Sequence, residues 1–548
     1  MKTLDFCKAY WNLTEAHEAF GDAFVMTVSA SDTAYEDFCG ALRDAGWSVY
    51  TAREEYQNRF ATYLGFCERL FLCYSAFGQK LRMVVERGEG LLPPRAEDRD
   101  YTMRTTPLVT QVELAYCKAD CGMSYVIRLS DGRFVIIDGG YDEYEEAERL
   151  YDVLKSQNVL EKITVAAWII THPHGDHYLC FMQFCKDHGN SVDIQQLLYN
   201  WPLPSMCKYP CNTTAYDALV ASLGIDVIVP HTGQRFCYAD AVFDVLFACE
   251  DLYPNVIRNT NDSSIVLRMD LGGKRFLWLA DAEFVSCEEI CRTFSAKALK
   301  CDILQVGHHG YDGGSPELYR RSDPEALLWP CPDFWYYPVR LWKSNDFLRK
   351  SPNIKHIFIE GHGSTVLDMS LSDPASAADV APIVASPLYE TDFQKTRRVI
   401  DLGWSCITGG DTGYSSPNIV LSEDGCEIAT GGRAVCLVRR PDQLADTLSY
   451  TMTLKAAAEI NEGGRIGLIC NYANPTVWSE DEVCWLALDE KSGETCLCLD
   501  AEAQTARLSY YGKLAREWDY VPAERRGLYL VIENARLFIK QIQIREKR

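Results

Sequence analysis

The chain has 548 residues, of which 47% are hydrophobic and 12% aromatic, so it can bury large cores and is not disordered. Its formal net charge of −23 repels nucleic-acid backbones and anionic membranes, which argues against general nucleic-acid binding and membrane docking. No apolar run approaches the length of a membrane span, and the N-terminus lacks the apolar core of a signal peptide. The 23 cysteines include no Cys-x-x-Cys pair, so we expect reduced thiols in a cytoplasmic protein.

Residues 1–95 are predicted to form a small α+β domain without chemistry of its own. A helical pattern covers Thr33–Ala45, and alternating apolar residues then predict four short strands. These strands are expected at Ser48–Ala52, Arg59–Leu64, Glu68–Ala76 and Lys80–Glu86. A proline-containing linker, Leu91–Arg95, separates this domain from the next.

The second predicted domain, residues 105–370, alternates strands and helices, and three of its strands end in potential metal ligands. Ile163–Ile170 precedes the sequence THPHGDH at 171–177, Lys274–Leu279 precedes Asp281, and Asp302–Val306 precedes His308 and His309. Ligands at the carboxyl ends of separate strands gather at one rim of an αβ fold, where such folds bind their ligands. Residues 360–363 are predicted to form a hairpin turn between two further strands.

The THPHGDH segment concentrates four candidate ligands in seven positions: His172, His174, Asp176 and His177. Pro173 and Gly175 force a tight, non-helical path that spreads the imidazoles around a point. Nitrogen and oxygen ligands at this density suit zinc or a similar metal. A polar loop without a metal is the alternative, but packing these groups against a core strand would be costly without a shared partner.

The order of five segments resembles the metallo-β-lactamase superfamily. These are DGG at 138–140, THPHGDH at 171–177, NDSSIVL at 261–267, LADA at 279–282 and VGHHG at 306–310. The pattern is most similar to the branch that includes the hydrolase domain of the ComEC DNA-uptake channel and the choline-phosphate esterases. The match covers about half of the chain. It implies an α/β fold, an αββα sandwich of two sheets with helices outside, and a hydrolytic site with one or two divalent metal ions. Zinc is the expected metal, with manganese or iron as alternatives.

The resemblance also implies how two metals would be held. Asp281 would bridge them, and Asp176, His177 and His309 would complete one site, with Asp176 also part of the catalytic centre. His172 and His174 would hold the other metal.

Two further residues receive supporting roles from the same resemblance. His308 would donate a proton to the substrate oxyanion or leaving group, although one ligand beside one packing histidine remains an equal interpretation of the pair His308/His309. Asp138 would orient a ligand without binding metal.

The sequence departs from the family pattern at two points. Many members have another histidine between the main motif and the bridging aspartate, and the two candidates here, His188 and His231, are better explained as structural residues. The site of His172 and His174 is therefore predicted to lack one protein ligand. Tyr311 also stands where the related branch usually has serine.

Residues 388–548 are predicted to form a β-sandwich accessory domain of lectin-like or jelly-roll type. Short strands recur at even spacing, and no helix-length periodic segment interrupts them after about residue 445. Among these strands are Leu448–Ala456, Arg465–Tyr472, Gly527–Ile532 and Ala535–Ile544. The spacing does not indicate an oligomeric state.

The leading hypothesis is a metal-dependent hydrolase that cleaves a phosphodiester or another small ester or amide with a metal-bound hydroxide. Its substrate would be a small molecule or a glycan-linked group. The alternative is a carbohydrate- or protein-binding scaffold whose metallo-β-lactamase fold is structural or nearly inactive. The missing ligand and the two flanking domains motivate this second hypothesis.

Overall fold

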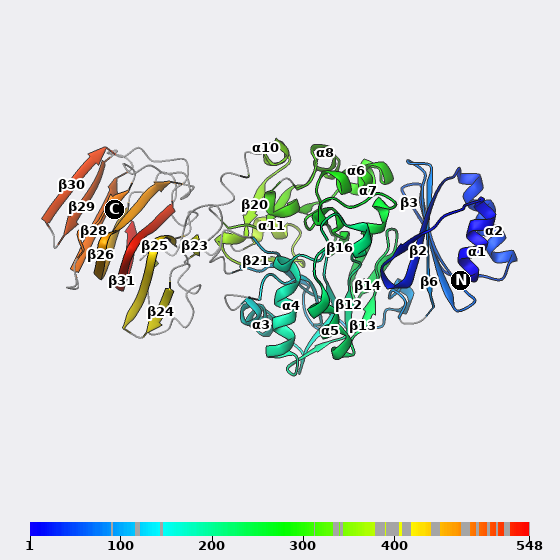
Figure 1. Ribbon diagram of the computed structural model, residues 1–548, viewed down its shortest axis with the longest axis horizontal. Coiled ribbons are helices and arrows are strands. Elements are labelled where there is room, and N and C mark those ends of the chain that lie inside the picture. Colours follow the sequence, from blue (N-terminus) through cyan, green and yellow to red (C-terminus); the bar gives the residue numbers. More distant parts are fainter. Residues whose placement is uncertain are drawn as a thin grey trace. The chain divides into compact units, whose positions relative to one another are not determined.

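The computed structural model describes two compact units, each considered by itself (Figure 1). The first covers Met1–Leu114, Gly122–Cys331 and Val339–Ala378, and the second contains Asp379–Arg548. The described residues are 1–88, 91–114, 121–142, 146–311, 313–332, 339, 343–378, 389–390, 405–407, 418–422, 424–439, 450–472, 483–488, 493–500, 505–510, 513–519 and 527–546. The α+β segment at the N-terminus and the αβ segment that follows it thus share one compact unit.

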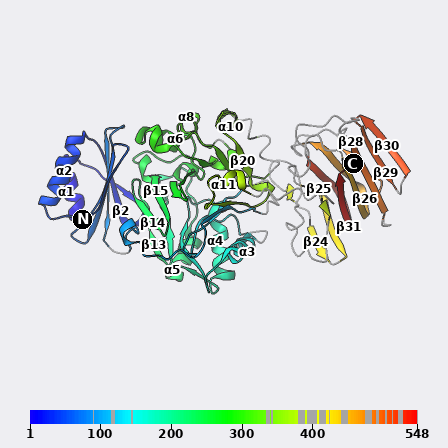
Figure 2. The same cartoon turned by 180° about the vertical axis from the view of Figure 1, so that it is seen from behind.

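The first part of unit one is a six-stranded antiparallel sheet with two helices on one face, as Figure 2 shows from behind. Helix α2 (Asp32–Asp44) begins after Ser31, whose hydroxyl accepts a hydrogen bond from the N–H of Ala34. Its buried residues recur every three or four positions and pack on the sheet together with α1 (Lys2–Trp11). The strands, in sheet order, are β1 (His17–Ala19), β2 (Ala23–Ser29), β6 (Lys80–Arg87), β5 (Glu68–Ser75), β4 (Asn58–Gly65) and β3 (Ser48–Glu55).

The second part of unit one contains two sheets that share one core. Tyr125 of the first sheet packs on Trp278 of the second, with ring centroids 4.7 Å apart, and both belong to one buried apolar cluster. The first sheet has the order β13 (Asp226–Ile228), β12 (Gln196–Leu198), β10 (Ile163–Ile169), β9 (Phe134–Asp138), β8 (Ser124–Arg128), β7 (Leu108–Gln111) and β21 (Thr365–Asp368), with β11 (Val192–Ile194) beside β10. The second has the order β14 (Arg235–Tyr238), β15 (Ala241–Phe247), β16 (Val266–Leu271), β17 (Lys274–Trp278), β18 (Ile303–Gln305), β19 (Ala326–Trp329) and β20 (His356–Ile359).

Helices cover the outer faces of both sheets, so the predicted αββα fold class is confirmed. Helices α3 (Glu146–Gln157) and α4 (Gly175–His188) pack on β8 and β9 of the first sheet, and α6 (Phe284–Thr293) packs on β15 of the second. The other helices of this part are α5 (Thr214–Leu223), α7 (Ala296–Leu299), α8 (Pro316–Ser322), α10 (Lys343–Arg349) and α11 (Pro374–Ala377). None of the helices within the described ranges is long and apolar enough to cross a membrane.

Parallel pairing brings the chemically important strand ends together. Strands β9 and β10 run parallel, as do β17 and β18, so each pair ends at the same edge of its sheet. Strands β9 and β10 are almost wholly buried because the core covers one face and helices the other.

One sequence prediction about this part is wrong. Residues 360–363 do not close a hairpin, because β20 pairs with β19 in the second sheet while β21 pairs with β7 in the first. The chain crosses between sheets there, and a local pattern of two apolar runs around glycines cannot distinguish a crossing from a hairpin.

The described strands of unit two form one ten-stranded sheet around its own buried apolar cluster. Its longest strands are β25 (Gly425–Arg439), β26 (Tyr450–Tyr472) and β31 (Gly527–Glu546), which pair antiparallel with β31 in the middle. The remaining strands are β22 (Tyr389–Glu390), β23 (Ser405–Ile407), β24 (Asn418–Ser422), β27 (Cys484–Trp485), β28 (Gly493–Asp500), β29 (Thr505–Tyr510) and β30 (Lys513–Asp519). Residues 379–388, just before β22, lie outside the described residues.

Candidate metal centre

The THPHGDH segment follows β10 and runs directly into α4. His174 is the residue before the first helical turn, with extended backbone (φ −100°, ψ 146°), and α4 begins at Gly175. Asp176 and His177 therefore lie in the first turn of the helix, while His172 and His174 lie on the extended segment before it. The change from extended chain to helix turns all four side chains toward one region.

Four side chains form the first candidate group: Asp176, His177, Asp281 and His309, whose ligand atoms lie within 4.8 Å of one another. Oδ2 of Asp281 is 3.3 Å from Nε2 of His177 and 3.4 Å from Nε2 of His309. Oδ2 of Asp176 lies 3.2 Å from Nε2 of His309. Two imidazoles and two carboxylates thus converge from β10–α4, the end of β17 and the end of β18.

A second candidate group shares Asp281 with the first and adds His172 and His174. Nε2 of His172 lies 3.7 Å from Oδ2 of Asp281, and the rings of His172 and His174 have centroids 4.6 Å apart. The two groups contain the six residues that the sequence named as ligands, and Asp281 stands between them.

The imidazole nitrogens and the Asp281 oxygen that lack hydrogen-bond partners fit metal ions as ligands. Nε2 of His172, His177 and His309 and Oδ1 of Asp281 are buried and have no hydrogen-bond partner among the described residues. A buried nitrogen or carboxylate oxygen without a partner costs free energy. Several such atoms facing the same carboxylate are best satisfied by cations, and imidazole nitrogens with carboxylate oxygens are a zinc-type ligand set.

Residues outside the two groups fix the direction of the imidazoles. Oδ2 of Asp138 lies 2.8 Å from Nδ1 of His177 and also accepts a hydrogen bond from Oγ1 of Thr171 at 2.7 Å. The carbonyl oxygen of Pro330 lies 2.8 Å from Nδ1 of His309. With Nδ1 beside an acceptor, each ring turns its Nε2 toward Asp281.

The two carboxylates of the first group favour positive charge on its histidines or on a bound ion. Burial lowers the pKa of His309, but Asp281 and Asp176 outweigh burial and raise that pKa to about 10. Burial would raise the pKa of Asp281, yet His309 and His177 hold it well below its usual value. A metal ion must therefore displace a proton from His309, which couples metal affinity to pH.

Four residues at the strand ends have left-handed backbone although none is glycine. They are Asp138 (φ 56°), Ala280 (φ 47°), His308 (φ 47°) and His309 (φ 54°). Such conformations cost free energy and persist where surrounding contacts impose them, most often at functional sites. At the histidine pair, the consecutive left-handed residues turn only His309 into the first group, while Nε2 of His308 lies 3.9 Å from Oδ2 of Asp281 and outside both groups.

Sequence comparison identifies the fold. The profile of the metallo-β-lactamase superfamily matches residues 121–207, which include β8 to β10 and the THPHGDH segment. This part of the chain is a metallo-β-lactamase superfamily domain. No curated protein matches the chain significantly.

Several solved structures resemble parts of the chain at low identity. The metallo-β-lactamase fold protein YhfI from Bacillus subtilis is 12% identical, with a TM-score of 0.30, covering 46% of this chain and 96% of that one. CmlA, a diiron β-hydroxylase from Streptomyces venezuelae, is 14% identical, with a TM-score of 0.31, and the match covers 48% and 54% of the two chains. The carbohydrate recognition domain of Emp47p is 11% identical, with a TM-score of 0.23, covering 30% and 97%.

Two other histidines of the metallo-β-lactamase domain lie outside both candidate groups. His188 stacks on Tyr151 with ring centroids 4.0 Å apart and has Nε2 3.0 Å from Glu148. His231 lies between Glu250, 2.8 Å from its Nδ1, and Glu86, 3.5 Å from its Nε2. The second group therefore keeps three protein ligands.

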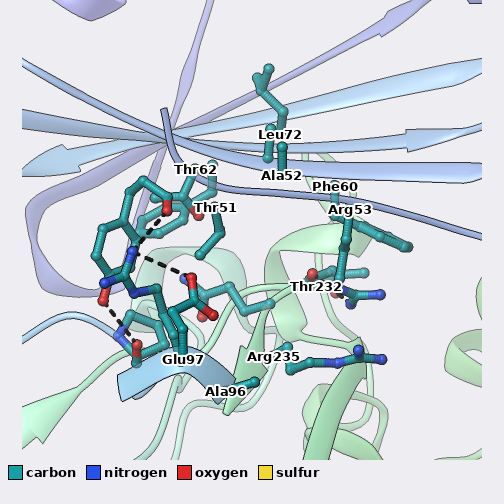
Figure 3. A pocket seen from close by; sticks show the side chains of 17 residues that line it. Thr51, Ala52, Arg53, Phe60, Thr62, Leu72, Ala96, Glu97, Thr232 and Arg235 are labelled. Carbon is teal, nitrogen blue, oxygen red and sulfur yellow. Dashed lines mark hydrogen bonds and ion pairs between the residues drawn. The ribbon is translucent and has the colours of Figure 1, made fainter. Parts of the chain in front are cut away.

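A separate cavity of about 210 Å³ lies where the N-terminal sheet meets the metallo-β-lactamase domain (Figure 3). Arg53, Phe60 and Arg235 are among its lining residues, and none of the six candidate ligands is. Arg53 and Arg235 lie 3.0 and 2.7 Å from Oδ1 of Asp244, and both also pair with Glu55, so each guanidinium group already has carboxylate partners.

Proposed function

We propose that the metallo-β-lactamase domain hydrolyses a phosphodiester or another small ester or amide with the help of divalent metal ions. The observation that carries the proposal is the convergence of unpaired buried imidazole nitrogens on Asp281. A structural role alone gives no reason to bury several such atoms around one carboxylate. The VGHHG segment, with its histidine pair, supports membership of the ComEC-type branch.

The ligand set indicates the charge of the substrate. Asp176, His177, Asp281 and His309 would hold one ion, and His172, His174 and Asp281 the other. When bound, divalent ions lower the pKa of a coordinated water and polarise a substrate oxygen. Since the two groups together contain only two carboxylates, two divalent ions would leave the centre positively charged, which favours an anionic phosphodiester. Zinc fits the ligand set, with manganese or iron as alternatives.

His308 is the proposed proton donor. Its side chain is 22% exposed, in contrast to the buried ring of His309, and its Nε2 faces the edge of the centre near Asp281. In phosphodiester hydrolysis a water oxygen bonds to phosphorus, the bond from phosphorus to the leaving oxygen breaks, and that oxygen takes up a proton. An imidazole at the edge of the centre supplies that proton.

The test compares metal content with turnover. We expect about two equivalents of metal after dialysis and hydrolysis of bis-p-nitrophenyl phosphate that chelation abolishes and metal restores. At most one equivalent and no turnover would support the alternative, a carbohydrate- or protein-binding scaffold, which the three-ligand second group and the β-rich second unit favour.

We also propose a cytoplasmic location and a small-molecule or glycan-linked substrate. Buried thiols such as Cys7, Cys180 and Cys287 are free, which supports a reducing compartment. Fractionation of the native source with a cytoplasmic marker tests the location.

A further inference from the structure

The surroundings of His308 contain two side chains that the proposed mechanism has not used. Oε1 of Glu283 lies 3.0 Å from Nδ1 of His308. Nδ2 of Asn261 lies 3.0 Å from Nε2 of the same ring and donates a hydrogen bond to Oε1 of Glu283 at 3.0 Å. Both nitrogens of the ring therefore have a polar neighbour, and these neighbours are bonded to each other.

Glu283 lies at the N-cap of α6, but its side chain does not cap the helix. It is the residue before the first turn of α6, and its side chain makes no capping hydrogen bond. Oδ1 of Asp262 takes that role by accepting hydrogen bonds from the N–H and hydroxyl of Ser286, at 3.0 and 2.8 Å. The carboxylate of Glu283 is thereby free to face His308.

Neighbouring amides hold the Glu283 carboxylate in place. Nδ2 of Asn259 donates to its Oε1 at 2.7 Å, beside the bond from Asn261. Because a carboxylate only accepts, both asparagines must turn their amide nitrogens toward it. Glu283 is mostly buried, with 17% of its side chain exposed, so its position is restricted by packing as well as by these bonds.

The two contacts restrict the orientation of the His308 ring. A carboxylate oxygen of Glu283 lies 3.0 Å from Nδ1, and the amide nitrogen of Asn261 lies 3.0 Å from Nε2. The ring is thus held from both sides, with Nε2 on the side of Asp281.

We propose that Glu283 and Asn261 are positioning residues that set the orientation of His308 for catalysis. This inference rests on the proposed hydrolase function and deepens it. Glu283 acts through His308, because the contact between its carboxylate and that ring connects it to the centre. Its removal should therefore lower kcat and leave substrate binding, metal content and folding unchanged.

The experiment uses the full-length, metal-loaded protein with bis-p-nitrophenyl phosphate. Glu283→Ala should lower kcat by about 10- to 100-fold, part of the range expected for loss of a proton-transferring group, with KM, metal content and Tm near the wild-type values. Glu283→Gln keeps an acceptor oxygen at the same reach and should recover much of the lost kcat. Glu288→Ala is the matched control, because Glu288 lies on the same helix and pairs with Arg292 at 2.8 Å on the surface.

Combination with His308→Ala decides whether Glu283 acts through the ring. In the His308→Ala background, Glu283→Ala should cause no further loss of kcat. An equal, additive loss in both backgrounds, a Glu283→Ala variant as active as Glu288→Ala, or loss of metal from Glu283→Ala would each overturn the inference. Absence of wild-type turnover with full metal content would instead reject the hydrolase proposal itself.

Discussion

Two buried clusters of histidine and carboxylate in unit one differ in how their nitrogen atoms are matched. At the metal centre, Nε2 of His172, His177 and His309 all face the single oxygen Oδ2 of Asp281. At the junction with the N-terminal sheet, His231 has one carboxylate for each nitrogen, Glu250 for Nδ1 and Glu86 for Nε2. At the metal centre three ring nitrogens share one carboxylate oxygen, whereas each ring nitrogen of His231 has a carboxylate of its own nearby.

The junction cluster continues as a series of paired charges. Arg82 contacts Asp251 and lies 3.5 Å from Glu289, and Nδ2 of Asn200 donates to Glu250 at 2.7 Å. Each of these buried charges lies beside an opposite charge, which offsets part of the cost of burying it. The comparison teaches that burial of a histidine beside acids does not indicate a metal site, whereas convergence of several rings on one carboxylate does.

The largest expected effect comes from Asp281, the residue common to both groups. Asp281→Asn should abolish activity and metal binding together, because a neutral amide cannot bridge two cations. Metal analysis after dialysis and a turnover assay check this. A variant that retains the wild-type metal stoichiometry would remove Asp281 from the centre.

Alanine substitutions of the adjacent residues His308 and His309 should impair the protein in different ways. His309→Ala removes one of four protein ligands, so metal affinity and Tm should fall. His308→Ala should keep metal content and Tm while lowering kcat by about 10²–10⁴. Thermal melts, metal analysis and steady-state kinetics on both variants separate the roles, and the reverse pattern would exchange them.

The junction histidine should affect stability in a pH-dependent way. Burial lowers the pKa of His231, but Glu250 and Glu86 outweigh burial and raise it to about 9. Because the folded pKa exceeds the unfolded value, protonated His231 stabilises the protein fully below about pH 6.5, and this contribution is lost as the pH rises through 9. The difference in unfolding free energy between wild type and His231→Gln should shrink by roughly 3 kcal/mol across that window. Urea unfolding at pH 6 and pH 10 measures it.

A control distinguishes this effect from a general loss of a histidine. His188→Gln leaves His231 and its carboxylates intact, so it should keep the wild-type pH dependence. A constant difference between wild type and His231→Gln at both pH values would contradict the assigned pairing.

The smallest expected effect is an order of metal loss. The ion held by Asp176, His177, Asp281 and His309 has four protein ligands, and the ion at His172 and His174 has three including Asp281. During a chelator titration the second should leave first. Simultaneous loss of both ions would count against unequal sites.

The sequence predicted the candidate ligands because each follows a strong local signal, an apolar strand that ends in polar residues. It also predicted the three strands that precede them within a few residues. The partnership of Glu283 with His308 carried no such signal, because it depends on how α6, residues 259–263 and the left-handed turn at 307–310 pack in space. The left-handed backbone at Ala280 and Asp138 could not be predicted from the sequence either, because neither residue is a glycine.

Irregularities inside long strands were also predicted incorrectly from the sequence. The sequence divided β26 and β31 into two strands each, and the structure has one continuous strand in both places. In β26 the register shifts between Ile460 and Arg465, where Gly463 and Gly464 lie. Local polar and glycine residues mark such an irregularity as a turn, although hydrogen bonds to β31 resume on both sides of it.

The ion pairs between the N-terminal sheet and α6 have a consequence for how this metallo-β-lactamase domain can be inherited or engineered. Lys80 and Arg82 of β6 both reach Glu289 on α6, the helix that begins just after Asp281 and Glu283. Excision of the first 95 residues would remove Arg82, the counter-charge of Asp251, and would leave Glu289 with Arg292 of its own helix. We therefore expect that the metallo-β-lactamase domain of this chain cannot be transferred to another protein alone. Any shuffled or minimised version must carry the small sheet with it or replace those acids with apolar residues.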